Sequence, residues 1–238
     1  MFNKRHIVRT IAATVSILAL SFTAACGSGQ STASNSTDSD DITQQTYKPG
    51  KLTIATGQPA YEPWVMNDKP ESGEGYEAAV AYAVADKLGF KKSDVVWTRT
   101  AFDTAIAPGA KDWDFNIQQF GITDERKKAV DFSSSYYNDS QSVVVKKDSK
   151  FANATKVSDL KDATVGVMVG TLAYDYAKAN IKDDIQTFND DAALAQALDA
   201  GQIDVLVTST VECVYMVQSE QVKDSKVLGR LPDSEDKS

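Results

Sequence analysis

Residues 120–137, FGITDERKKAVDFSSSYY, hold the densest group of side chains that could bind a small molecule. Arg126 is the most distinctive of them, because a guanidinium offers paired donors that match a carboxylate and does not lose its proton. The start of a solvated helix explains the same charges: Thr123 would cap it, with acidic residues in the first turn and lysines further along. Composition does not separate the two interpretations, so the position of Arg126 in the fold must do so.

The residues that the chain lacks exclude several kinds of chemistry. Its one histidine, His6, lies in the N-terminal leader, so the mature chain has none. This excludes His-based triads, most general-base catalysis near neutral pH, and zinc or copper sites built on imidazole. The net charge of −8 becomes about −11 without the three basic residues of the leader, and no basic stripe is present, which argues against nucleic-acid binding. We expect no metal, no cofactor and no nucleic-acid partner.

The N-terminus has the pattern of an export signal. In residues 1–25 a basic start precedes an apolar run that is too short and too interrupted for a comfortable membrane span, and small residues follow it. The next motif, TAAC, resembles the lipobox of bacterial lipoproteins, with Thr23 where leucine is usual. This resemblance implies a lipid on Cys26. Residues 26–49 have almost nothing to bury and are predicted to be a flexible linker to the membrane surface.

The second cysteine, Cys213, lies in the apolar stretch TVECVYMVQ. If Cys26 carries lipid, Cys213 has no partner for a disulfide. We expect Cys213 to be a small buried apolar residue.

From residue 51 onward, β-rich and helical stretches alternate. The expected strands are 51–56, 94–99, 114–120, 142–147, 164–169, 184–188, 204–208 and 226–231, and the expected helices are 76–89, 101–107, 172–180, 191–201 and 211–222. This alternation predicts an α/β fold with mostly parallel sheets and helices on both faces. A faint internal echo pairs KLTIATG with TVGVMVG and KDWDFNI with GQIDVLV, which favours two lobes with a core each.

Ligands bind to such sheets beyond the carboxyl ends of the strands. In the first half of the chain this edge carries Tyr61, Phe102 and residues 119–126, and in the second half it carries Thr171 and Ser209. Aromatic rings, hydroxyls and one arginine thus come from both halves, which predicts a cleft between two lobes. This position favours the ligand-binding interpretation of Arg126.

From about residue 50 to residue 231 the chain resembles the extracellular solute-binding proteins of family 3, the amino-acid receptors of ABC importers. The resemblance rests on the ordered motifs GKLTIAT, YEPW, GYEAAVAYAVADKLG, FDTAI, DFNIQQFGITDERKKAVDFSSSYY, VGVMVGTLAYDY, GQIDVLVT and KVLGRLP. It implies a two-lobed periplasmic-binding-protein-like fold of type II, with lobe 1 at residues 50–138 and lobe 2 at residues 139–231. Family members then return through a second hinge and complete the first lobe. We expect this return to be missing here, with residues 232–238 as a truncated second hinge.

The resemblance also implies a set of ligand-binding residues: Tyr61, Phe102, Gly121, Thr123, Arg126, Thr171 and Ser209. Arg126 matches the arginine that binds the α-carboxylate of the ligand. Gly121 and Thr123 match positions that add backbone and hydroxyl donors, and Thr171 matches a further carboxylate donor at a helix N-terminus.

The remaining positions concern the side chain and the amine of the ligand. Tyr61 and Phe102 match aromatic residues that enclose the ligand side chain. The family often has an aspartate for the α-ammonium where this chain has Ser209. Either another acid such as Glu77 or Asp103 substitutes for it, or the ligand is not an ordinary α-amino acid.

The sequence therefore predicts a lipid-anchored, exported receptor without enzymatic activity. It would capture an amino acid or a related small carboxylate and deliver it to an ABC permease. One alternative is a dehydratase of cyclic acids on the same fold, with Glu77 or Asp103 as the catalytic carboxylate. The other is the ligand-sensing domain of a signalling receptor, which requires a membrane span after the domain.

Overall fold

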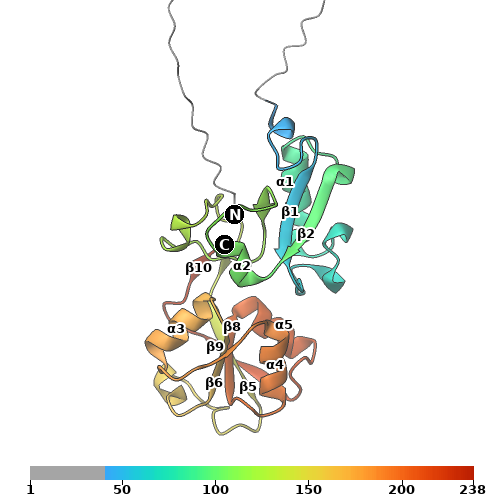
Figure 1. Cartoon of the computed structure of the whole chain (residues 1–238). Helices are drawn as coiled ribbons and strands as arrows, with labels where there is room; N and C mark the ends of the chain where they lie inside the picture. The colour runs from blue at the N-terminus through green and yellow to red at the C-terminus, as the bar shows by residue number, and fades with distance from the viewer. Residues whose placement is uncertain (1–40) are drawn as a thin grey trace, which may run out of the picture.

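The computed structural model describes residues 41–238, which form two α/β lobes (Figure 1). Lobe 1 holds a three-stranded sheet and lobe 2 a five-stranded sheet. The predicted signal peptide, most of the predicted linker, and Cys26 lie outside the described residues. In Figure 1 lobe 1 is the upper body, coloured blue to green, and lobe 2 is the lower one, coloured yellow to red.

Lobe 1 is built around a buried parallel sheet in the order β2-β1-β3. Its strands and helices are β1 (Leu52–Gly57), β2 (Val95–Thr100), β3 (Phe115–Asn116), α1 (Tyr76–Lys87) and α2 (Phe102–Ile106). Every residue of β1 is buried, as expected for the central strand of a parallel sheet. Ala81 and Ala85 of α1 pack against Leu52 and Ile54 of β1. These small side chains let the helix lie close to the sheet.

The third strand is shorter than the predicted 114–120. Only Phe115 and Asn116 pair with β1, and Gln119 adopts a positive φ of 49°. The N–H of Gln119 donates to the Glu77 carboxylate at 2.8 Å instead of to a neighbouring strand. Glu77 therefore ends the strand and turns the chain toward the boundary between the lobes.

Lobe 2 contains a mixed sheet in the order β7-β6-β8-β5-β9, in which β5 runs antiparallel to both its neighbours. Its strands are β5 (Gln141–Lys146), β6 (Val165–Met168), β7 (Gln186–Phe188), β8 (Val205–Ser209) and β9 (Ser225–Arg230). Its helices are α3 (Leu172–Asn180), α4 (Asp191–Asp199) and α5 (Thr210–Gln218).

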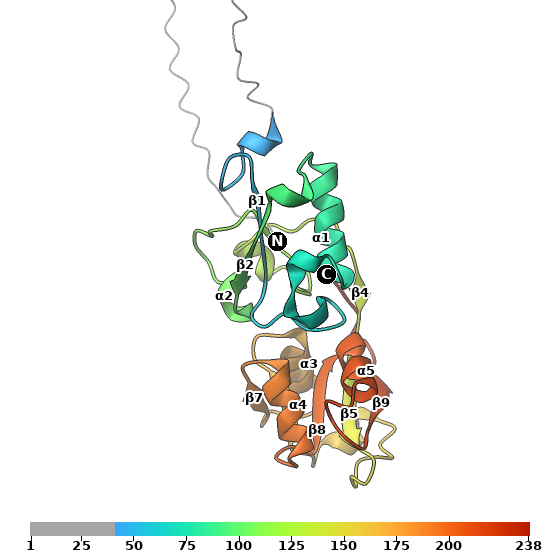
Figure 2. The same cartoon turned by 90° about the vertical axis from the view of Figure 1, so that its right-hand side faces the viewer.

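Helices cover both faces of the lobe 2 sheet. Val143 and Val145 of β5 join the core under α3, whereas Val144 joins the core under α4 and α5, which lie in front of the sheet in Figure 2. This alternation follows from the period of two in a β-strand. Cys213 of α5 is a fully buried free thiol in the second of these cores, so its predicted burial is confirmed.

Two short antiparallel strands join the lobes, β4 (Asn138–Asp139) and β10 (Asp236–Lys237). The C-terminal residues also bond to lobe 1. The Lys237 carbonyl accepts from the N–H of Ile122 at 2.7 Å, and the Ser238 carbonyl accepts from the N–H of Tyr136 at 2.7 Å. A second crossover segment is thus present and reaches lobe 1 at Ser238 (Figure 1). The sequence predicted a truncated hinge here, and it did not predict either of these two-residue strands.

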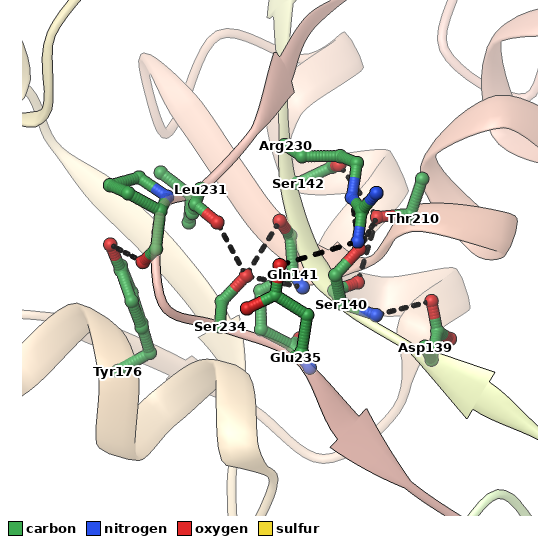
Figure 3. A network of polar contacts seen from close by, with 11 residues as sticks. Asp139, Ser140, Gln141, Ser142, Tyr176, Thr210, Arg230, Leu231, Ser234 and Glu235 are labelled. Carbon is green, nitrogen blue, oxygen red and sulfur yellow. Dashed lines mark hydrogen bonds and ion pairs between the residues drawn. The ribbon is translucent and has the colours of Figure 1, made fainter.

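A polar network fixes this second crossover to lobe 2 (Figure 3). The hydroxyl of Ser234 accepts from the N–H of Gln141 at 3.0 Å and donates to the Leu231 carbonyl at 2.7 Å. Arg230 at the end of β9 donates to the Ser140 hydroxyl at 2.8 Å. Segments ninety residues apart are therefore bonded at the point where the chain changes lobe.

The α/β class and the two-lobed fold were both predicted correctly from the sequence. No helix within residues 41–238 is long and apolar enough to cross a membrane.

Candidate functional site

A cavity lies between the two lobes and encloses about 930 Å³, including space open to solvent. It is lined by loops after β1, β2 and β3 of lobe 1 and after β6, β7 and β8 of lobe 2, together with the two crossover segments. This is the arrangement that the strand-end rule predicts. Among the seven ligand-binding residues predicted from the sequence, six line the cavity: Tyr61, Phe102, Gly121, Arg126, Thr171 and Ser209.

Arg126 begins the 3-10 helix Arg126–Lys128, at the cavity wall contributed by lobe 1. Its guanidinium donates to the carbonyl of Gly121 and to the carbonyl of Gly170 in lobe 2, each at 2.9 Å. Burial lowers its pKa, although a guanidinium remains charged at any physiological pH. Arg126 thus brings a positive charge to the boundary of the lobes and has donors left for a ligand carboxylate.

Two stacked rings support this guanidinium. Phe102 and Phe120 lie with their ring centroids 4.0 Å apart and their planes at 23°. The central carbon of the Arg126 guanidinium is 5.8 Å from the Phe102 centroid and 5.5 Å from the Phe120 centroid. Contacts of this kind hold the plane of the guanidinium and favour its charge.

Thr123 is not among the residues that line the cavity. Its hydroxyl accepts from the N–H of Arg126, the first residue of the short helix, at 3.1 Å. Asp124 and Glu125 form ion pairs with the lysines three residues further on. The segment is thus a solvated helix start, and the same short helix places Arg126 at the cavity wall. Ligand binding by Arg126 stays a prediction.

Thr171 and Ser209 both cap helices of lobe 2 at the cavity. The Thr171 hydroxyl accepts from the N–H of Tyr174 at 3.2 Å and donates to the Met168 carbonyl at 2.8 Å. The Ser209 hydroxyl accepts from the N–H of Glu212 at 3.2 Å. The first turns of α3 and α5 therefore point their positive ends toward the cavity.

The lobes touch around the cavity. The Tyr61 hydroxyl, from lobe 1, accepts from the N–H of Ala192 in α4 at 3.4 Å, and the Tyr215 hydroxyl of α5 donates to Glu62. The lobes also approach closely at Gly121, where an added Cβ would lie 2.4 Å from the Cδ1 atom of Leu172 in lobe 2, so that side chain would have to shift.

Neither acid that the sequence offered for the ligand amine lines the cavity. Glu77 is fully buried in lobe 1, where it accepts from the N–H and side-chain amide of Gln119 and from the Tyr136 hydroxyl. Burial raises the pKa of Glu77 to about 7. Asp103 lies in the first turn of α2 and accepts from the N–H of Thr104. Neither Glu77 nor Asp103 therefore lies where a ligand would bind, which does not favour the dehydratase alternative.

Other carboxylates do line the cavity, and they were not predicted from the sequence. The acidic side chains that line the cavity are Asp139, Asp190, Asp191, Glu212 and Asp236. Asp190 and Asp191 follow β7, so the strand-end rule would have found them. Glu212 lies in the first turn of α5, directly after β8. Asp139 and Asp236 lie in the two-residue crossover strands, which carry no sequence pattern.

Burial changes the acid strength of these groups. It raises the pKa of Asp191 to about 6, and it raises the pKa of Glu212 well above its ordinary value, with a further contribution from the nearby charge of Asp191. Burial also raises the pKa values of Asp139 and Asp236. Within residues 41–238, no group of three or more His, Cys, Asp or Glu side chains is arranged to hold a metal ion.

Residues 52–170 match the family described as bacterial extracellular solute-binding proteins, family 3. The chain belongs to this family. It is 31% identical to the glutamine-binding protein of Geobacillus stearothermophilus, over 86% of this chain and 82% of the relative. It is also 31% identical to the L-cystine-binding protein TcyJ of Escherichia coli, over 66% of this chain and 59% of the relative. The chain thus spans about three fifths of the length of the cystine-binding protein.

Solved structures of amino-acid-binding proteins have the same two-lobed fold as this chain. An ancestral arginine-binding protein bound to arginine superposes with a TM-score of 0.66 at 30% identity, over 79% of this chain and 84% of the other. An ancestral amino acid-binding protein, a precursor of cyclohexadienyl dehydratase, superposes with a TM-score of 0.65 at 29% identity, over 79% of each chain. All four of these relatives are named as binding proteins, and none as an enzyme.

Proposed function

We propose that this family 3 protein is the receptor of an ABC importer, which captures an amino acid in the cavity between its lobes and delivers it to a membrane permease. The observation that carries the proposal is the placement of Arg126. Its charged fork lies at the wall of the cavity between the lobes, supported by two aromatic rings and next to carbonyls from both lobes. A planar fork of this kind matches a carboxylate.

The rest of the cavity suits the remainder of an amino acid. The aromatic ring of Tyr61 and the rings beside Arg126 offer apolar surface, and the cavity acids offer partners for an ammonium group. The relatives named for cystine, glutamine and arginine support the same ligand class.

Binding is tested first by thermal unfolding of the purified chain with each common amino acid, cystine and ornithine. A ligand at one hundred times its dissociation constant stabilises the folded chain by about 2.7 kcal/mol, which raises Tm measurably. Calorimetry then gives the affinity of each positive ligand. If no amino acid raises Tm and none produces heat with a chain shown to be folded by circular dichroism, the proposed function is wrong.

Delivery to a permease is tested in cells. Uptake of the bound amino acid should fall when the chain is deleted and return when the wild-type chain is restored. Restoration with Arg126→Ala should not recover uptake at limiting solute. Unchanged uptake after deletion would argue against an importer.

The proposal includes export and a lipid anchor at Cys26, with the protein on the extracellular or periplasmic face of the membrane. The signal-like residues 1–25 and the TAAC motif support it. Mass analysis of the N-terminus should find lipid on the wild-type protein, and Cys26→Ser should move the exported protein to the soluble fraction. A wild-type N-terminus without lipid would refute the anchor.

A further inference from the structure

The charges of the cavity are unequal. Five acidic side chains line it, whereas Arg126 is the one lysine or arginine among its described lining residues. A zwitterionic amino acid brings one negative and one positive group, so it requires about as many anions as cations from the protein. Asp191 and Glu212 hydrogen-bond to each other and so share one proton, but the acids still outnumber Arg126. The cavity can therefore accept more positive charge than an α-ammonium supplies.

Two of these acids form a buried pair in lobe 2. Asp191 and Glu212 are each only 7% exposed, and the Thr208 hydroxyl lies 3.5 Å from the first and 2.9 Å from the second. Neither takes part in the ion pairs formed within residues 41–238. Because Asp191 and Glu212 hydrogen-bond to each other, one of them holds a proton and the pair carries a single negative charge. A buried carboxylate without a cation is costly unless a positive charge arrives from elsewhere.

The cavity acids form two groups, one near the expected α-ammonium of an amino acid and one near its side chain. Asp236 lies close enough to Arg126 for their charges to interact, so it can reach an ammonium next to a carboxylate held by Arg126. Asp190 and Asp191 lie instead beside the hydroxyl of Tyr61, which comes from lobe 1. An aromatic ring beside carboxylates is a favourable environment for an organic cation.

We infer that the cavity selects an amino acid whose side chain carries a second cation, an ammonium or a guanidinium, bound by Asp191 and Glu212 with Tyr61 beside it. This inference rests on the proposed amino-acid binding and adds the class of side chain. The acids of lobe 2 determine specificity, while Arg126 and Asp236 hold the α-carboxylate and the α-ammonium that all amino acids share.

Matched ligands test the inference on the full chain. Citrulline has the shape of arginine without its charge, and norleucine has the length of lysine without the ammonium. Calorimetry at one salt concentration measures the affinities. Arginine or lysine should bind at least about 30-fold more tightly than its neutral counterpart, because loss of a buried charge partner costs at least about 2 kcal/mol.

The double variant Asp191→Asn, Glu212→Gln should reduce this ratio to within about threefold. It should leave the affinity for the neutral counterpart unchanged or higher, because the carboxylates no longer need a cation. The control is Asp86→Asn, which removes one exposed charge from α1 in lobe 1 and should keep the full ratio.

The outcomes separate the two proposals. If glutamine, norleucine or citrulline binds as tightly as the cationic ligand, the inference is wrong and amino-acid binding stands. If the double variant keeps the full preference for arginine or lysine, these two acids do not determine it and the inference is also wrong. If no amino acid binds the folded wild-type chain, the proposed function fails and the inference with it.

Discussion

Replacing Arg126 tests the central contact of the cavity. The alanine variant removes both 2.9 Å hydrogen bonds to the Gly121 and Gly170 carbonyls, the contact with two aromatic rings, and the charge that would bind a ligand carboxylate. Loss of a buried partner for a charge costs about 2–5 kcal/mol, so Arg126→Ala should weaken binding by about 30- to 5,000-fold.

A lysine at position 126 distinguishes the effect of the positive charge from the effect of the planar guanidinium with its paired donors. Arg126→Lys keeps a positive charge but presents it as a point, so it forms fewer of the paired bonds and stacks less well on Phe102. Its affinity should fall between those of the wild type and the alanine variant. Lys128→Ala is the matched control, because Lys128 belongs to the same short helix but forms an exposed ion pair with Glu125; its effect should be within about threefold.

Calorimetry with the amino acid that most raises Tm measures these affinities, and urea unfolding without ligand checks the fold. Arg126 also bridges the lobes through Gly170, so the ligand-free alanine variant should have a larger radius of gyration by small-angle X-ray scattering. Affinity within threefold of the wild type in a correctly folded Arg126→Ala variant would refute the assigned role.

Three further predictions concern closure and buried acids. Gly121→Ala places a Cβ 2.4 Å from Leu172 Cδ1 and should weaken binding by about 1 kcal/mol, with recovery when Leu172→Ala is added; equal affinities by calorimetry would contradict this. Burial raises the pKa of Glu77 from 4.5 to about 7, so the folded chain binds the extra proton and its stability falls as pH rises through that window, by on the order of 3 kcal/mol; urea unfolding of Glu77→Gln should lack this slope. For Asp191, with a pKa of about 6 beside Glu212, affinity for a cationic ligand should fall below pH 6 because protonation removes its charge; a flat calorimetric profile from pH 5 to pH 8 would contradict this.

Several residues of the cavity could be predicted from the sequence. Tyr61, Phe102 and Arg126 follow strands whose apolar runs are easily recognised, so one rule about strand ends brought them together. The same rule applied to β7 would have added Asp190 and Asp191. They were overlooked because they also read as the capped start of the next helix.

Other features left no signal in the sequence. Strands β4 and β10 are two residues each, too short for any periodic pattern, and their pairing depends on a network between residues ninety positions apart. Glu77 is the second residue of α1, two positions after the N-cap Gly75, and has the pattern of an exposed first-turn acid. Its burial results from Gln119 and Tyr136, which only the tertiary structure brings to it.

The contacts between the lobes suggest how a ligand would drive closure. Tyr61 of lobe 1 lies against the start of α4, beside Asp190 and Asp191, and its own hydroxyl is partly removed from water there. Closure without a ligand therefore gains the Tyr61 and Arg126 contacts but increases the cost of uncompensated carboxylates. We expect a cation bound in the cavity to offset that cost in the closed state. A ligand shifts an equilibrium by its difference in affinity for the two states, so the same acids that would choose the ligand would also couple its binding to closure.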